Sequence, residues 1–175
     1  MEMKKQFSII KTIIATSALL LLPTFAQAEH FNPYGYSVDG GEIRWDGTTK
    51  YGYARDWGIQ QWNALGKVSI LPDTATTYAD VTFEDVYVPK VGWEARWVDS
   101  LGADEIQFNT YYMDYNTSFA NRAVATHELG HALGLGDHGE NDNWTYRQII
   151  MWYCAECSGV NTPQSHDKYD YEQLW

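Results

Sequence analysis

The chain has 175 residues, a formal net charge of −11 at pH 7 and 15% aromatic residues, including eight Trp and thirteen Tyr. This acidic balance disfavours nucleic acid and anionic membrane surfaces as partners. Aromatic side chains supply core area and also line substrate and glycan clefts, so composition alone does not separate an enzyme from a binding module.

The first 28 residues have the composition of a secretory signal peptide. Lys4, Lys5 and Lys11 precede an apolar run over 13–22, and the small residues AQA follow at 26–28. This order predicts export and cleavage after Ala28, because the run is too short for a membrane-spanning helix, which needs about 20 apolar residues. We therefore expect a secreted, extracellular domain at 29–175, with a net charge of −13 once three lysines and one glutamate leave with the signal.

The rest of the chain has the order of elements of a single α+β domain. Alternating apolar residues predict strands, and apolar residues spaced three or four apart predict helices. In chain order we predict strands at 42–46 and 49–54, a helix at 54–65, strands at 67–71, 79–86, 92–98 and 104–113, a helix from 116–118 to Leu133, and a closing helix at 165–175.

The helix that ends at Leu133 contains the first part of the segment HELGHALGLGDH, residues 127–138. His127 and His131 are one turn apart, so their side chains share one face of the helix. The remaining positions are mostly apolar, which predicts a buried, central helix. Gly134 can adopt the left-handed conformation that ends a helix and turns the chain back.

Two histidines in this arrangement are typical ligands of a catalytic zinc ion, which needs a third protein ligand and an open fourth position. Glu128 is turned about 100° from His127 around the helix, so it reaches a zinc-activated water rather than the metal and is the candidate general base. Of Asp137 and His138, only one can face the metal, because neighbours in a non-helical segment point to opposite sides. The alternative reading is a pair of buried histidines without a metal.

The pattern HExxHxxGxxD over 127–137 resembles the signature of metzincin zinc peptidases with a matrixin-like catalytic domain, whose last position is histidine. An aspartate followed by histidine is similar to the snapalysin branch of small secreted neutral proteases. The resemblance implies a zinc-dependent endopeptidase that hydrolyses peptide bonds with a metal-activated water. It implies His127, His131 and Asp137 as zinc ligands and Glu128 as the general base.

The resemblance extends to the fold and to a second segment. It implies a twisted, mostly parallel sheet with an antiparallel edge strand, a central zinc-binding helix and a C-terminal helix. The segment IIMW around Met151 resembles the methionine turn beneath the metal, and the chain after it, 152–165, is implied to line the pocket for the residue after the scissile bond. Tyr153 has the spacing of the astacin and serralysin tyrosine that stabilises the oxyanion; an aromatic residue packed in the loop is the alternative.

Two weaker signals concern a disulfide and calcium. Cys154 and Cys157 are the two cysteines of the chain, and in an exported protein we expect them to form a local disulfide. Carboxylates at Asp99, Asp104 and Glu105, and others in the segment GENDN after the zinc motif, are candidate Ca²⁺ ligands; a solvated acidic surface is the alternative.

Two other functions compete with this interpretation. A thermolysin-like zinc peptidase would take a distant glutamate, Glu156, as its third ligand, but Gly134 and Asp137 would then have no role. A secreted zinc-containing binding module for glycans would use the Trp and Tyr surface, but would leave Glu128 without a purpose. We expect a monomer that acts on protein or peptide substrates, with 105–110 as the edge strand that pairs with the substrate backbone.

Overall fold

The computed structural model describes residues 31–139 and 147–175, so the predicted signal peptide and its cleavage site lie outside the described residues. Its centre is a five-stranded sheet with the strand order β2-β1-β3-β5-β4. Four strands run parallel and β4 pairs antiparallel to β5 at one edge. The strands are β1 (Glu42–Gly47), β2 (Ser69–Pro72), β3 (Val81–Val86), β4 (Ala95–Val98) and β5 (Asp104–Asn109).

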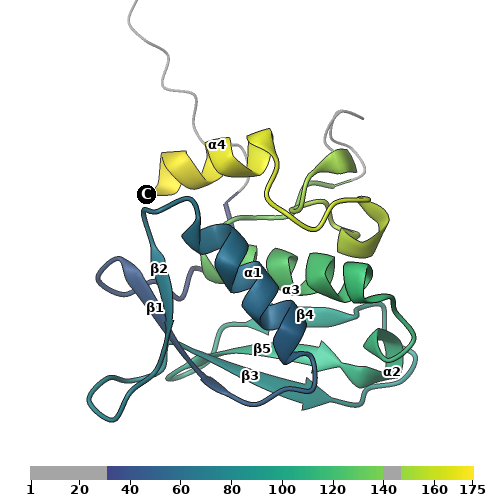
Figure 1. Cartoon of the computed structure of the whole chain (residues 1–175), viewed down its shortest axis with the longest axis horizontal. Coiled ribbons are helices and arrows are strands. Elements are labelled where there is room, and N and C mark those ends of the chain that lie inside the picture. The colour runs from purple at the N-terminus through teal and green to yellow at the C-terminus, as the bar shows by residue number, and fades with distance from the viewer. Residues whose placement is uncertain (1–30, 140–146) are drawn as a thin grey trace, which may run out of the picture.

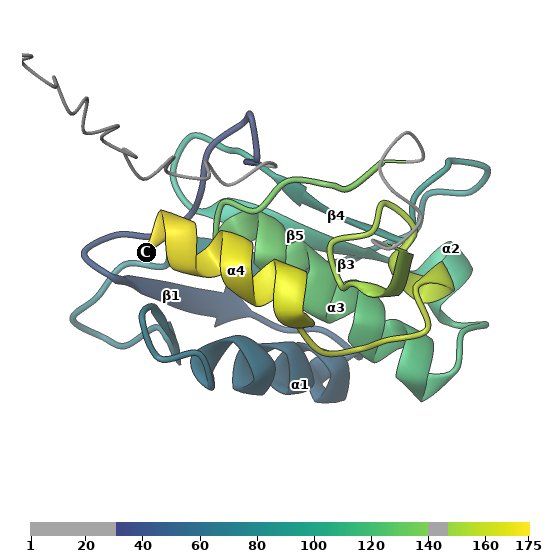
Figure 2. The same cartoon turned by 90° about the horizontal axis from the view of Figure 1, so that it is seen from above.

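The helices lie in two layers on one side of this sheet. They are α1 (Gly52–Asn63), α2 (Thr110–Met113), α3 (Ser118–Ala132) and α4 (Ser165–Leu174), with a short 3-10 helix, η2 (Ala155–Cys157). Figures 1 and 2 show α1 and α3 side by side over the sheet, and α4 on the side of α3 away from it. This architecture confirms the predicted α+β class, with its parallel sheet, antiparallel edge strand, central helix and terminal helix.

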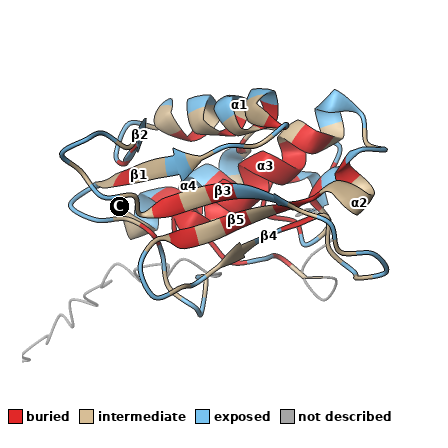
Figure 3. Cartoon of the chain, turned by 90° about the horizontal axis from the view of Figure 1, so that it is seen from below, coloured by how far each residue is buried: buried red, intermediate tan, exposed pale blue. Residues whose placement is uncertain are grey.

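The central helix α3 begins and ends as its sequence predicts. Thr117 is its N-cap, and the Thr117 side chain accepts a hydrogen bond from the backbone N–H of Ala120 at 3.2 Å. Past its C-terminal end, Gly134 has a φ of +91°, and the Leu135 N–H donates to the carbonyl of Gly130. Nearly all of α3 from Asn121 onward is buried, as Figure 3 shows, so its histidines lie inside the molecule.

The core lies between the sheet and the helices α1 and α3. Trp62 of α1 donates its indole N–H to the backbone carbonyl of Thr126 in α3 at 2.8 Å, which satisfies a buried polar group at this contact. The largest core side chains on the sheet are Ile43, Ile70, Phe83, Ile106 and Phe108. Among the described residues, no helix is both long and apolar enough to cross a bilayer.

Two of the predicted elements are wrong. Residues 49–54 form no strand; the Tyr51 carbonyl instead accepts bonds from the N–H groups of Ala54 and Arg55, and α1 starts at Gly52. Tertiary packing overrides the alternating aromatic pattern. Ala54, Gly58 and Trp62 are the buried residues of α1, and α1 packs on α3. The strand predicted over 104–113 stops at Asn109, whose side chain accepts from the Tyr111 N–H and caps α2.

The predicted edge strand at 105–110 is also wrong. It falls on β5, which has β3 on one side and β4 on the other. The free edges of the sheet belong to β2 and to β4, and β4 packs beside α3. Periodicity could not reveal this, because strand order in a sheet follows from tertiary packing and not from the local pattern.

Close packing of α1 on α3 makes Gly58 sensitive to substitution. A Cβ at Gly58 would lie 2.8 Å from Leu129 Cδ1 and 3.1 Å from the Thr126 Cα. We expect Gly58→Ala to lower the free energy of unfolding by about 1–3 kcal/mol through overpacking. Gly52→Ala on the same helix is the control, because its Cβ meets nothing closer than 3.7 Å; it should be neutral or stabilising by up to about 1 kcal/mol. Equal denaturation midpoints for the two variants would contradict this packing.

Candidate metal centre

Three polar atoms converge at the end of α3 nearest its C-terminus. The Nε2 atoms of His127 and His131 lie 3.0 Å apart. Asp137 Oδ1 lies 3.1 Å from the first and 3.4 Å from the second. The structure therefore brings together the two histidines of one helical turn and the carboxylate that follows the Gly134 turn.

Both histidines have their other ring nitrogen held by a backbone carbonyl. His127 Nδ1 lies 2.8 Å from the Ile150 carbonyl oxygen, and His131 Nδ1 lies 2.9 Å from that of Leu135. A carbonyl only accepts hydrogen bonds, so each Nδ1 carries the proton and each neutral ring presents the lone pair of Nε2. Histidines that bind metals are commonly oriented in this way.

This geometry fits a metal ion. Two nitrogen lone pairs and a carboxylate oxygen at such distances repel one another unless a proton or a metal cation lies between them. Three zinc ligands at Zn–N distances of about 2.0–2.1 Å occupy corners of a tetrahedron separated by about 3.3 Å, which is close to the spacing of these three atoms.

Electrostatics at the site also favour positive charge. Burial lowers the pKa of His127, but the neighbouring carboxylates of Asp137 and Glu128 outweigh it and bring the pKa to about 9. Burial likewise raises the pKa of Asp137, but hydrogen bonds and attraction from the two histidines leave it far below its ordinary value. The side chain of Asp137 is 51% exposed, so this corner of the site opens to solvent.

Glu128 lies beside the cluster but outside it. The side chain is buried, and its Oε2 accepts a hydrogen bond from the backbone N–H of Trp97 in β4 at 2.7 Å. The donor atoms that lie within 4.8 Å of one another at this site come from His127, His131 and Asp137. Glu128 is thus oriented by the edge strand through one of its two carboxylate oxygens.

Met151 lies under the histidine-bearing turn of α3, as the resemblance implies. A Cβ at Gly130 would collide with the Met151 sulfur, so the glycine lets this turn approach α3 closely. The turn is held by Asp167 of α4, which accepts bonds from the N–H groups of Ile150 and Met151 at 2.9 and 3.0 Å. Burial raises the pKa of Asp167, although these N–H groups act in the opposite direction. Asp167 therefore positions the carbonyl that orients His127.

A cleft of about 730 Å³ opens onto these residues. One wall is β4 and the segment before it, and the other includes Tyr153, Cys154 and Glu156. Tyr153 is 48% exposed on this rim, so its position is compatible with either of the roles predicted for it. His138 does not face the cleft; its side chain lies next to Asp170 of α4, at 3.4 Å.

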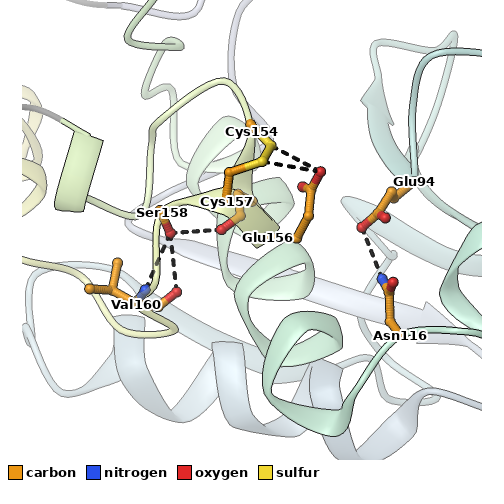
Figure 4. The surroundings of a disulfide bond; sticks show 8 residues. Glu94, Asn116, Cys154, Glu156, Cys157, Ser158 and Val160 are labelled. Atoms are coloured by element: carbon orange, nitrogen blue, oxygen red, sulfur yellow. Dashed lines mark hydrogen bonds between the residues drawn. A yellow bond between two sulfur atoms is a disulfide. The ribbon is translucent and has the colours of Figure 1, made fainter.

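The predicted disulfide between Cys154 and Cys157 is present and closes the loop around η2. Figure 4 shows this loop above one end of α3. Glu156 is turned toward the sulfurs, and Glu94 lies beyond Glu156 and is turned toward Asn116. Glu156 Oε1 lies 2.9 Å from Cys154 Sγ, and Glu156 is not among the three residues whose donor atoms meet at the zinc motif.

The described residues give the predicted calcium site no support. Asp104 Oδ2 accepts from the Ser37 hydroxyl at 2.6 Å, and its Oδ1 accepts from the Ser100 N–H at 3.1 Å. Glu105 accepts from the Gln107 amide. The carboxylates of Asp104 and Glu105 thus already accept hydrogen bonds from other groups of the protein. Most of the GENDN segment lies outside the described residues.

Sequence reasoning missed Asp167 and the Trp97 N–H. Asp167 could have been noticed as the third residue of a capping box, since the Gln164 N–H donates to its Oδ2 at 2.7 Å, but nothing local links it to Ile150. Trp97 contributes a backbone group, which carries no sequence signal.

Comparison with known proteins adds information on the fold. No family model matches the sequence, and no curated protein matches it. Among solved structures, the chain is similar to that of myroilysin, with a TM-score of 0.55 and 13% sequence identity, over 83% of this chain and 97% of the other. The chain therefore shares its fold with myroilysin. At this level of identity the likeness establishes the fold and not the reaction.

The contact between Asp167 and the methionine turn predicts a coupling between folding and metal binding. Asp167→Ala leaves buried N–H donors without acceptors, at about 1–3 kcal/mol each, and releases the carbonyl that orients His127. We expect lower stability and zinc binding weakened by about 10–100-fold, measured by competition with a chromophoric chelator. The neighbouring Lys168→Ala on the exposed side of α4 is the control and should change neither property. Unchanged zinc affinity in Asp167→Ala would show that the turn holds itself in place.

Proposed function

We propose that the protein is a secreted zinc-dependent endopeptidase. The single observation that carries the proposal is the convergence of two imidazole nitrogens and a carboxylate oxygen, at 3.0–3.4 Å, beside an independently held glutamate in an open cleft. Such a set leaves one tetrahedral position open, as catalytic zinc sites require. The fold supports the same conclusion, and the predicted signal peptide supports secretion.

Each side chain has a distinct task in this proposal. His127, His131 and Asp137 hold the ion, which when bound supplies a Lewis acid that polarises the substrate carbonyl and acidifies a water. Glu128 takes the proton from the attacking water and passes it to the leaving amine. The Trp97 N–H holds one carboxylate oxygen of Glu128, which fixes the orientation of this side chain in the lining of the cleft.

The position of the Asp137 carboxylate oxygen and the charge of that carboxylate both support Asp137 as the third ligand. Its Oδ1 lies nearly equidistant from the two histidine nitrogens. A carboxylate neutralises one of the two positive charges of zinc, so the water at such a site is somewhat less acidic than it would be beside three neutral histidines. His138 has its side chain on the other side of the chain, as the alternation of neighbours predicts.

The substrate is proposed to bind along β4. This strand is a free edge of the sheet and one wall of the cleft, and the Trp97 N–H points from it toward Glu128. A peptide in extended conformation could pair with the remaining polar groups of that edge. On the opposite wall Tyr153 is proposed to stabilise the oxyanion, and the segment 152–165, of which 153–156 line the cleft, to shape the pocket for the residue after the scissile bond.

Glu128→Gln tests the reaction. Zinc content should stay at the wild-type level, because Glu128 is not one of the proposed ligands and glutamine keeps an acceptor for the Trp97 N–H. Glutamine cannot take a proton, so peptidase activity should fall by roughly 10²–10⁴-fold. The assay is a cleavage-site profile on a denatured protein mixture, run with and without a chelator. Activity within tenfold of wild type would remove Glu128 from the mechanism, and zinc-containing wild-type protein that binds glycans but cleaves nothing would favour the binding module.

Asp137→Ala tested beside Glu156→Ala separates the two candidate third ligands. Both are exposed carboxylates on the same cleft, so general effects of charge are matched. We expect Asp137→Ala to hold one zinc ion fewer per chain than wild type in native mass spectrometry, and Glu156→Ala to hold the wild-type number. The reverse result would establish a thermolysin-like ligand set.

A further inference from the structure

We infer that the protein has a second transition-metal site, formed by His138, His166 and Asp170. Their candidate ligand atoms lie within 4.8 Å of one another, on the side of the zinc-motif turn that faces α4. His138 follows Asp137 directly in the chain, so the two sites would lie on opposite sides of one short segment. Neither the endopeptidase reaction nor the zinc site proposed for it uses these three side chains.

The second cluster has the same ligand types and nearly the same spacing as the first. Asp170 Oδ2 lies 3.4 Å from His138 Nε2 and 3.4 Å from His166 Nε2. The two imidazole rings are 4.8 Å apart and inclined at 71°, against 4.6 Å and 88° for His127 and His131. The two separations of 3.4 Å between Asp170 Oδ2 and the histidine nitrogens match the edge of about 3.3 Å expected between ligands of a tetrahedral zinc ion.

A simple ion pair explains this arrangement less well. Charge-assisted hydrogen bonds between nitrogen and a carboxylate are commonly about 2.7–2.9 Å long, and both histidines here stand farther from the carboxylate than that. Asp170 is 2% exposed, and its Oδ1 has no hydrogen-bond partner among the described residues. A buried carboxylate with one unsatisfied oxygen is costly, and a bound cation would offset that cost.

The three side chains are held by elements that are already fixed. His166 and Asp170 are one turn apart on α4, in the same relation as His127 and His131 on α3. The backbone of His138 is bonded on both sides, its N–H to the Met151 carbonyl at 2.8 Å and its carbonyl to the Tyr153 N–H at 3.0 Å. Such support reduces the cost of ordering the ligands when the ion binds.

The ligand chemistry selects the kind of ion. Two imidazoles and one carboxylate suit Zn²⁺ and similar first-row transition metals, whereas Ca²⁺ and Mg²⁺ prefer sets made of oxygen atoms. The side chains of His138 and Asp170 are only 1% and 3% exposed, while that of His166 is 20% exposed and marks the side from which the ion enters. The ion would tie α4 to the segment that carries Asp137, which is a structural role.

Zinc stoichiometry tests the site. Metal-stripped protein is reloaded with zinc, dialysed and measured by native mass spectrometry. We expect two ions per chain in wild type and in Lys168→Ala, an exposed control on the same helix, and one ion in His166→Ala. The variant His131→Ala should also keep one ion, and the double variant of His131→Ala and His166→Ala should keep none.

Thermal unfolding supplies a second readout that does not depend on peptidase activity. Zinc should raise the Tm of the His131→Ala protein and leave that of the double variant unchanged. Equal numbers of zinc ions per chain in wild type and His166→Ala would overturn the second site. A single zinc ion per chain in wild type would also overturn it, regardless of the results for the variants. If that single ion is lost in His131→Ala, the proposed endopeptidase site stands and the second site alone fails.

Discussion

The mutual repulsion of His127 Nε2, His131 Nε2 and Asp137 Oδ1 is the constraint on which the rest of this structure depends. Three electron-rich atoms at 3.0–3.4 Å from one another are unfavourable unless they share a proton or a metal cation. The surroundings make this requirement stricter, because the carbonyls of Ile150 and Leu135 hold the protons on the outer ring nitrogens. The centre of the protein therefore favours a positive charge, and a metal ion bound there would add its binding free energy to the stability of the fold.

Much of the remaining structure serves to hold this arrangement against that repulsion. The contact of α1 with α3 buries the back of the histidine-bearing helix, and Gly130 admits the methionine turn against it. Asp167 of α4 then holds that turn through backbone N–H groups. On the other side, β4 supplies both a wall of the cleft and the N–H that orients Glu128. Layers distant in sequence thus meet at one point, which explains why the helix is so completely buried.

The likeness to the fold of myroilysin at 13% identity shows how little of the sequence such a fold fixes. Few residues need to be kept if the requirements are a pattern of buried and exposed positions and turns at the right places in the chain. Those requirements are geometric, and many sequences can fill the intervening core. The repetition of a histidine, histidine and aspartate set around Asp170 shows how readily an i, i+4 pair on a helix combines with a residue from a neighbouring segment.

The sequence by itself determined the local features of this protein. The spacing of His127 and His131, the Thr117 cap and the turn at Gly134 all follow from helix geometry, and a disulfide across a three-residue separation needs little tertiary context. Only the tertiary structure decided that 49–54 joins a helix, that β5 is interior and β4 is the edge, and that His138 faces α4. Strand order, a backbone N–H donor and a carboxylate such as Asp167 act between segments far apart in the chain, and periodicity records only neighbours within a few residues.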